Sequence, residues 1–225
     1  MAYATEFTEL ESTSGSFATI DLQAFLAGVL TKVSKSLVNN SQFDIVGFVV
    51  EQMAQSIARW LEKENLHGTS GKITGLSTAT QVVETAAAAV VTSDELIDLQ
   101  DAVPDAFQAN AIWIMSPKTR NAVRKLKDGQ GNYLLEKDFT AKWGYKLLGK
   151  DVYVSDNMPN MGAGKKEIFY GDISGLALKF SEEINIEILR ERFATEHAIG
   201  VVGYVECDAK IENEQKIAVL VGKAA

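Results

Sequence analysis

The chain has 225 residues, of which 46% are hydrophobic and 23% charged, a balance typical of a globular protein with a sizeable core. Its formal net charge of -8 argues against tight binding of nucleic acid, because affinity for the phosphate backbone comes from Lys and Arg. The sequence contains no long apolar run typical of a membrane span, and residues 1–11 lack the basic start and apolar centre of a secretory signal.

Cysteine and histidine are scarce. The single cysteine, Cys207, excludes an internal disulfide and a cysteine-based metal site, and it suits a reducing cytoplasm. With only His67 and His197, a histidine-rich metal site is excluded too. We therefore expect structural roles for all three side chains, a buried and inert thiol for Cys207, and no metal or cofactor.

The N-terminal part is predicted to be extended chain. Residues 3–16 are polar and predict an arm or loop, and residues 17–24 alternate in the period-2 pattern of a strand with one apolar side. A second extended run is predicted over residues 25–33.

The strongest single element is a long amphipathic helix over residues 43–65, about 30 Å long at 1.5 Å per residue. Residues 41–44 resemble a capping box, with Asp44 in place of the usual Glu. Apolar residues at spacings of three and four predict one continuous apolar stripe: Ile45, Phe48, Val49, Met53, Ile57, Trp60 and Leu61.

Shorter elements follow. Residues 93–95 cap a short helix, Pro104 can open another, and Ser116 with Pro117 starts a basic helix over residues 118–127. Strands are predicted at 112–115, 145–148, 152–155 and 168–170, in long runs through 176–211, and at 217–221.

No motif carries recognisable chemistry. Residues 162–166 (Gly-Ala-Gly-Lys-Lys) lack the spacing of a phosphate-binding loop and predict a hairpin tip instead. Residues 128–132 lack the acidic positions of a calcium loop and predict a turn. The pair Glu182 and Glu183 predicts a solvated turn. The basic helix at 120–127 is favoured as a solvated face or a subunit contact over a nucleic-acid site, because the chain is acidic overall.

Four segments, in this order, are the most informative feature of the chain. They are Asp98-Leu-Gln-Asp-Ala-Val-Pro104, Ala111-Ile-Trp-Ile-Met-Ser-Pro-Lys-Thr119, Leu147-Leu-Gly-Lys-Asp-Val-Tyr-Val154 and Ile168-Phe-Tyr-Gly-Asp172. Together with the long helix and the closing strands, the chain resembles the major capsid protein of tailed bacteriophages, with the Hong Kong 97-type fold, over about residues 17–221.

The resemblance implies an α+β fold with two interleaved domains. A peripheral domain would hold the long spine helix and long antiparallel strands, over residues 25–72 and 176–211. An axial domain would hold a mixed sheet with flanking helices, over residues 73–166 and 212–225. Residues 1–24 would be the remnant of an extended loop that in the family reaches over a neighbouring subunit.

The implied function is structural and not enzymatic. Copies would assemble as pentamers and hexamers into an icosahedral head around double-stranded DNA, in the cytoplasm of the host bacterium. Scaffolding, portal or decoration proteins are further expected partners, with only weak proximity to packaged DNA and no membrane. Charge and position suggest these intersubunit contacts: Glu6, Glu9, Glu11, Glu51, Arg59, Glu62, Lys63, Arg190, Glu191 and Arg192.

Two rivals remain open. An encapsulin-type shell shares the fold but encloses enzymes, and a small α/β enzyme would need a convergent polar site that the sequence does not suggest. The chain also departs from the family by starting almost at the returning strand of the loop, so we expect it to fold but to assemble weakly alone. It has no Lys before Lys32, so we expect no Lys–Asn cross-links of the kind that some family members form from that loop.

Overall fold

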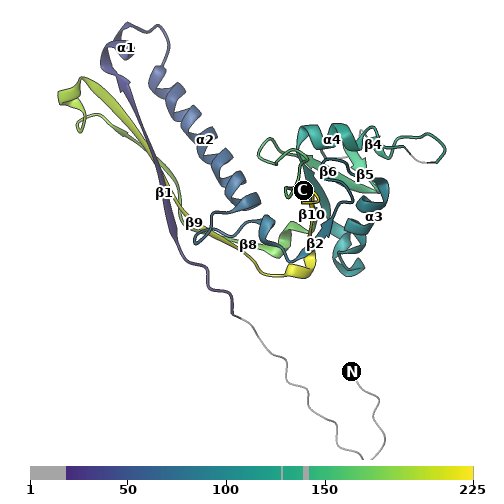
Figure 1. The fold of residues 1–225 in the computed structure, drawn as a ribbon. Helices are drawn as coiled ribbons and strands as arrows, with labels where there is room; N and C mark the ends of the chain where they lie inside the picture. The colour runs from purple at the N-terminus through teal and green to yellow at the C-terminus, as the bar shows by residue number, and fades with distance from the viewer. Residues whose placement is uncertain (1–18, 128, 139–141, 225) are drawn as a thin grey trace, which may run out of the picture.

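The computed structural model describes residues 19–127, 129–138 and 142–224, and it divides them between two sheets (Figure 1). A three-stranded antiparallel sheet, in the order β1-β9-β8, lies alongside one long helix. A seven-stranded mixed sheet has the order β2-β10-β7-β3-β6-β5-β4. We call the first part the long lobe and the second the compact lobe. The mixed α+β architecture agrees with the fold class expected from the sequence.

The chain passes between the lobes three times. The long lobe consists of β1 (Phe25–Ser34), α1 (Lys35–Asn40), α2 (Ile45–His67), β8 (Leu176–Leu189) and β9 (Ala198–Ile211). The compact lobe contains β2 (Gln81–Glu84), α3 (Ser93–Asp101), β3 (Ile112–Met115), α4 (Pro117–Val123), β4 (Leu135–Lys137), β5 (Tyr145–Leu147), β6 (Lys150–Val154), β7 (Lys166–Gly171) and β10 (Ile217–Val221). Single 3₁₀ turns occur at Leu76–Thr78, Asp105–Asn110, Ile173–Gly175, Ala194–Glu196 and Glu214–Lys216.

Helix α2 forms where the apolar spacing predicts it. Asp44 is its N-cap and accepts a hydrogen bond from the Gly47 amide at 3.0 Å, and Gly68 ends the helix at a φ of 69°. Met53 and Ile57 are buried against β9 at Gly203, where a Cβ would lie 2.9 Å from the Ile57 side chain. The helix can therefore approach the sheet closely at this glycine.

One position of the predicted apolar stripe does not face the core. Phe48 is 53% exposed, although Ile45, one turn earlier on the same stripe, is buried. The predicted apolar stripe is therefore not buried along its whole length. The short helix α1, which precedes α2, was not expected from the sequence.

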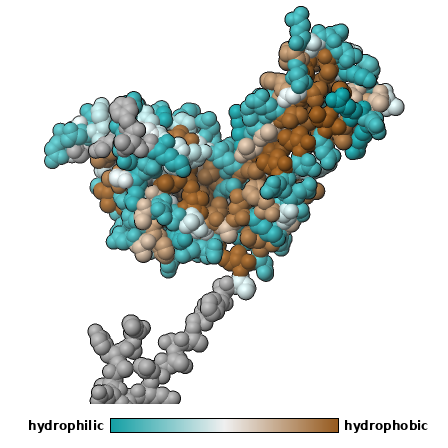
Figure 2. All heavy atoms as spheres, turned by 180° about the vertical axis from the view of Figure 1, so that it is seen from behind, coloured by the Kyte–Doolittle hydropathy of each residue, from teal (hydrophilic) through white to brown (hydrophobic). Residues whose placement is uncertain are grey.

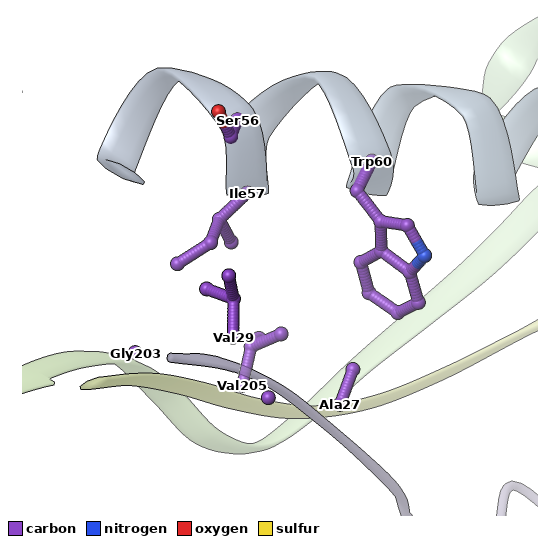
Figure 3. Close-up of a pocket in the computed structure, with 8 residues that line it drawn as sticks. Ala27, Val29, Ser56, Ile57, Trp60, Gly203 and Val205 are labelled. Carbon is purple, nitrogen blue, oxygen red and sulfur yellow. The ribbon is translucent and has the colours of Figure 1, made fainter. Parts of the chain in front are cut away.

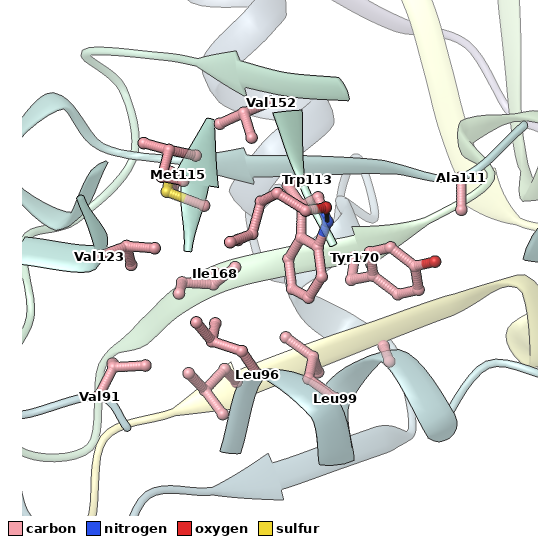
Figure 4. Packing of buried hydrophobic residues seen from close by; sticks show 14 of the residues in the cluster. Val91, Leu96, Leu99, Ala111, Trp113, Met115, Val123, Val152, Ile168 and Tyr170 are labelled. Atoms are coloured by element: carbon pink, nitrogen blue, oxygen red, sulfur yellow. Dashed lines mark hydrogen bonds between the residues drawn. The ribbon is translucent and has the colours of Figure 1, made fainter. Parts of the chain in front are cut away.

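The core of the compact lobe is built around Trp113 on β3 (Figure 4). Trp113 is fully buried, donates its indole N–H to the Leu147 carbonyl at 3.0 Å, and lies 4.3 Å from the Tyr170 ring, centroid to centroid. Leu96 and Leu99 of α3 pack on the same core. Helix α3 begins one residue earlier than expected, because Thr92 forms a reciprocal capping box with Glu95.

The expected strand over residues 17–24 is absent from its described part, residues 19–24. This segment has the alternating pattern but no partner strand. Side chains of the adjacent strands bind its backbone instead: the Asp208 carboxylate accepts from the Gln23 amide at 2.7 Å, and Lys179 donates to the Leu22 carbonyl at 3.3 Å. Residues 17 and 18 lie outside the described part of the chain.

The loop at residues 162–166 is not a hairpin tip. Its flanking strands, β6 and β7, lie on opposite sides of β3, so the loop crosses the end of that strand. The Gly164 amide donates to the Gly222 carbonyl at 2.8 Å, which ties the loop to the end of β10. Likewise, Glu182 and Glu183 lie within β8 at a shift in its register with β9, not in a turn. The basic helix is shorter than expected, since α4 ends at Val123.

Candidate interaction surfaces

The last turns of α2 hold the two lobes together. Glu62 accepts hydrogen bonds from the Tyr153 hydroxyl at 2.8 Å and from the Asn157 side-chain amide at 2.7 Å. His67 also bonds to this loop, because its Nε2 lies 2.9 Å from the Asn157 carbonyl oxygen. These bonds fix the end of the long helix to β6 and the loop that follows it.

The charged residues predicted from the sequence as intersubunit contacts lie in different parts of the structure. Glu51, Arg59 and Lys63 are exposed along α2, whereas Glu62 is half-buried and bonded within the chain. Arg190, Glu191 and Arg192 are exposed in the turn between β8 and β9, at the far end of the long lobe. Glu6, Glu9 and Glu11 lie outside the described residues. The structure thus gathers Arg190, Glu191 and Arg192 at one tip and places the four others that it describes along the helix.

A more conspicuous surface at this end of the long lobe consists of apolar residues. Leu37 is 56% exposed, Phe43 66% and Phe48 53%, and they border a hollow between the end of β1, α1 and the start of α2. We call these three residues the tip surface. Figure 2 shows apolar residues gathering along the long lobe towards this end. Contiguous exposed apolar side chains of this kind are typical of protein–protein contacts.

Sequence reasoning missed the tip surface because the helical periodicity placed Phe48 on the apolar stripe. Leu37 and Phe43 carried no signal of exposure either, since Val33 lies at helical spacing from Leu37 and Ile45 at strand spacing from Phe43.

A second hollow lies between α2 and the sheet, over β1 and β9 (Figure 3). Its volume is about 250 Å³ and its lining is almost wholly apolar, with Ile57, Trp60 and Val205 among the contributors. The one hydroxyl, that of Ser56, donates to the Gln52 carbonyl at 2.8 Å within the helix. The other polar side-chain group of the lining is the Trp60 indole N–H, so the lining offers no acid or base to act on a ligand. The hollow reflects incomplete packing between helix and sheet.

Two buried groups have altered acidity. Burial raises the pKa of the Cys207 thiol, with smaller contributions from Asp208 and Glu64, so the thiol stays protonated and unreactive. Its burial agrees with the expectation from the sequence. Burial also raises the pKa of Glu167, whose second carboxylate oxygen has no hydrogen-bond partner among the described residues.

Within the described residues, no three His, Cys, Asp or Glu side chains are grouped closely enough to hold a metal ion. No helix in the same part of the chain is long and apolar enough to cross a membrane. What the described surface does offer is exposed charge and apolar area on an elongated, two-lobed body. Such an arrangement favours binding to other macromolecules by shape and charge.

Comparison with known proteins gives one family. The model of the phage capsid family matches residues 1–222. No curated protein matches the chain significantly.

Solved structures agree with the family match. The capsid of an empty GTA particle is 25% identical with a TM-score of 0.82, and the alignment covers 100% of this chain and 81% of that chain. A structure from Gordonia phage Cozz is 15% identical with a TM-score of 0.70, covering 100% and 78%. The holo-SrpI encapsulin complex from Synechococcus elongatus PCC 7942 shares the fold at 15% identity, with a TM-score of 0.66 and coverage of 90% and 74%. The chain belongs to the phage capsid family and has the Hong Kong 97-type fold.

Proposed function

We propose that the chain is a major capsid protein whose copies form pentamers and hexamers and close into an icosahedral shell around double-stranded DNA. The observation that carries this proposal is the capsid-family match over nearly the whole chain, joined to an elongated subunit with exposed charged and apolar surfaces. Each contact between copies can be modest, because closed symmetry repeats it many times.

The two lobes correspond in this proposal to the two domains of a shell subunit. The long lobe, over residues 25–72 and 176–211, acts as the peripheral domain with α2 as its spine. The compact lobe acts as the axial domain, over residues 73–166 and 212–225. We extend its first segment to residue 175, because β7 pairs with β3 and β10 and the 3₁₀ turn that follows β7 bonds to residues 212 and 213. The bonds of Glu62 to Tyr153 and Asn157 keep the angle between them.

The contacts between copies are proposed at the tip surface and at the exposed charges of α2 and of the β8–β9 turn. The exposed Arg190 and Arg192 are suited to carboxylates of a neighbour. Reversal of both to Glu is expected to lower particle yield while leaving the fold intact by circular dichroism. Unchanged particle yield would remove this turn from the contact set.

Further partners follow from the same role. Scaffolding, portal or decoration proteins would bind the assembled surface, and assembly would take place in the cytoplasm of the host bacterium. Packaged DNA would be enclosed without tight binding, since the chain carries a net charge of -8.

Native mass spectrometry and sedimentation of the purified chain, from micromolar to millimolar concentration, test the proposal. We expect concentration-dependent oligomers of five and six copies, with closed shells forming weakly. A chain that remains monomeric throughout, together with turnover in a broad substrate screen, would contradict the proposal.

A second candidate function is the shell of a protein compartment, which the structural likeness to an encapsulin favours. The contents of particles purified from the native source separate the two. Double-stranded DNA supports the phage shell, and an enclosed enzyme supports the compartment.

A further inference from the structure

The compact lobe has a basic edge. Lys118 on α4, and Arg124 and Lys125 directly after it, are exposed. Arg124 and Lys125 line a hollow with Tyr133 and with Lys137 of β4. We call Lys118, Arg124 and Lys125 the basic edge. It is conspicuous in a chain whose overall charge is -8.

The same lobe has an acidic edge. Asp94, Asp98 and Asp101 are exposed on α3, and their spacing of four and three residues places them on one face of that helix. Exposed Glu84 at the end of β2, a strand that contacts α3, adds a fourth carboxylate. The exposed side chain of Ile97 lies beside this row. We call Glu84, Asp94, Asp98 and Asp101 the acidic edge.

The two edges occupy opposite ends of one sheet. Helix α3 contacts β2, β10 and β7, whereas the basic hollow is lined by β4, the last strand at the other end. Both lie on the same face, because Leu99 of α3 and Val123 of α4 belong to one core cluster. Even β7, the strand under α3 that is nearest to β4, is four strand spacings of about 4.8 Å away from it, or about 19 Å. The two edges therefore cannot pair with each other inside one copy.

Arg124, Lys125 and the three α3 aspartates are not neutralised by an ion pair within the described part of the chain. The ion pairs found there are Lys32–Glu196 and Lys146–Asp138. The helix dipole explains Asp94 in the first turn of α3 but disfavours Asp101 in its last turn. Lys118 at the start of α4 is unfavourable for the same reason. Stabilisation of their own helices therefore does not explain why Asp101 and Lys118 occupy these positions.

We propose that the basic edge of one copy binds the acidic edge of the next copy, in a head-to-tail contact between compact lobes. This inference rests on the proposed function, because it names the contact that would build its rings. A head-to-tail contact uses two different surfaces of the subunit and closes into a ring when the rotation allows it. Complementary charge at such edges sets orientation and suppresses contacts between like edges.

A second copy fits the basic edge better than DNA does. The edge is small, and the rest of the molecule carries the charge that makes the chain net negative, which repels a phosphate backbone. Every copy, by contrast, supplies one acidic edge for each basic edge. Ile97 and Tyr133, both more than half exposed, give the contact an apolar component.

Disulfide formation between single-cysteine variants tests the contact without requiring a closed shell. Asp98→Cys and Lys125→Cys are mixed under mild oxidation, with Cys207 left in place because it is buried. We expect a disulfide-linked dimer from the mixture and little from either variant alone. Lys72→Cys, an exposed lysine outside both edges, is the matched control and should not link to Lys125→Cys. Equal dimer from either variant alone, or none from the mixture, would overturn the proposal.

Charge reversal supplies the second test. Arg124→Glu with Lys125→Glu, and Asp98→Lys with Asp101→Lys, are each expected to weaken self-association by at least about tenfold. Combining all four reversals should restore most of the loss, because the edges are complementary again. If the combined variant is no better than the single-edge variants, the pairing is wrong. If reversal of the basic edge instead only removes retention on double-stranded DNA, the edge is a nucleic-acid surface and the proposal also fails.

The shell and the edge contact are contradicted by different results. A disulfide between Asp98→Cys and Lys125→Cys without five- and six-copy oligomers would leave the edge contact in place and contradict the shell. Five- and six-copy oligomers without that disulfide would keep the shell and overturn the edge contact.

Discussion

The hydroxyl of Tyr153 on β6 donates a hydrogen bond of 2.8 Å to the carboxylate of Glu62 on α2, and this bond joins the compact lobe to the end of the spine helix. Burial, reinforced by the bond to Glu62, raises the pKa of Tyr153, so the phenol remains a donor over the physiological range. Because Asn157 also donates to Glu62, the carboxylate is held by two groups of the compact lobe.

Tyr153→Phe is expected to lower the free energy of unfolding by about 1 kcal/mol, the usual contribution of one such bond. Hydrogen exchange at the last turn of α2 should rise, because that turn loses part of its attachment. Denaturant unfolding and exchange measure the two effects. Tyr204→Phe is the matched control, because it makes the same chemical change at a partly exposed tyrosine whose hydroxyl has no hydrogen bond within the described residues. Unchanged exchange in Tyr153→Phe would show that the bond does not restrain the lobes.

Gly171→Ala is expected to destabilise the protein by about 3 kcal/mol. Gly171 has a φ of 145°, and an added Cβ would lie 2.0 Å from the Lys216 carbonyl oxygen, a backbone atom that can move only with its strand. Gly129→Ala is the control, because a Cβ there meets nothing within 4 Å. Thermal unfolding compares the variants, and equal stability for both would contradict the packing of β7 against the start of β10.

Glu167→Gln is expected to stabilise the protein progressively as the pH rises. Burial raises the pKa of Glu167 above its ordinary value of 4.5, while the Gly162 amide and Lys165 oppose the shift and Glu95 reinforces it. An acid whose pKa is higher in the folded state than in the unfolded state contributes most to stability at a pH below its unfolded-state pKa. That contribution is lost as the pH rises through the folded-state pKa. The stability difference between variant and wild type should therefore grow with pH. A difference that is constant across pH would contradict the direction of the shift.

Leu37→Ser together with Phe43→Ser is expected to weaken self-association without lowering thermal stability, because both side chains are largely exposed in the single chain. Replacement of exposed apolar area removes the gain from burying it against a neighbour. Sedimentation and thermal unfolding of the same variant separate the two effects. Lower stability with unchanged association would mean that the tip surface packs within the chain.

The sequence predicted those elements whose formation depends on local pattern. The stripe through Met53 and Ile57 defined α2 to within two residues at each end, and the apolar run at Ile112–Met115 became buried β3. The short helix α1 was missed because six residues with no side-chain cap give little signal. Edge strands β2 and β4 were missed because runs of four and three residues are too short to show an alternating pattern.

The wrong predictions concern segments whose structure depends on partners far away in the sequence. Residues 19–24 alternate like a strand, yet Asp208, far away in sequence, binds the Gln23 amide where a partner strand would be needed. The loop at 162–166 looks like a hairpin only if β6 and β7 are neighbours, and the intervening β3 decides that they are not. Among the candidate contact residues, Glu62 was chosen for its charge. Its bond to Tyr153 depends on the fold and could not be read from the spacing.

The most direct test of the central claim, that this chain acts by fitting beside copies of itself, is a reconstruction of particles purified from the native source by electron cryo-microscopy. We expect an icosahedral shell in which this chain fills rings of five and six, with compact lobes adjoining and the tip surface of each long lobe covered by a neighbour. A shell built of a different protein, with this chain outside it or absent, would contradict the account.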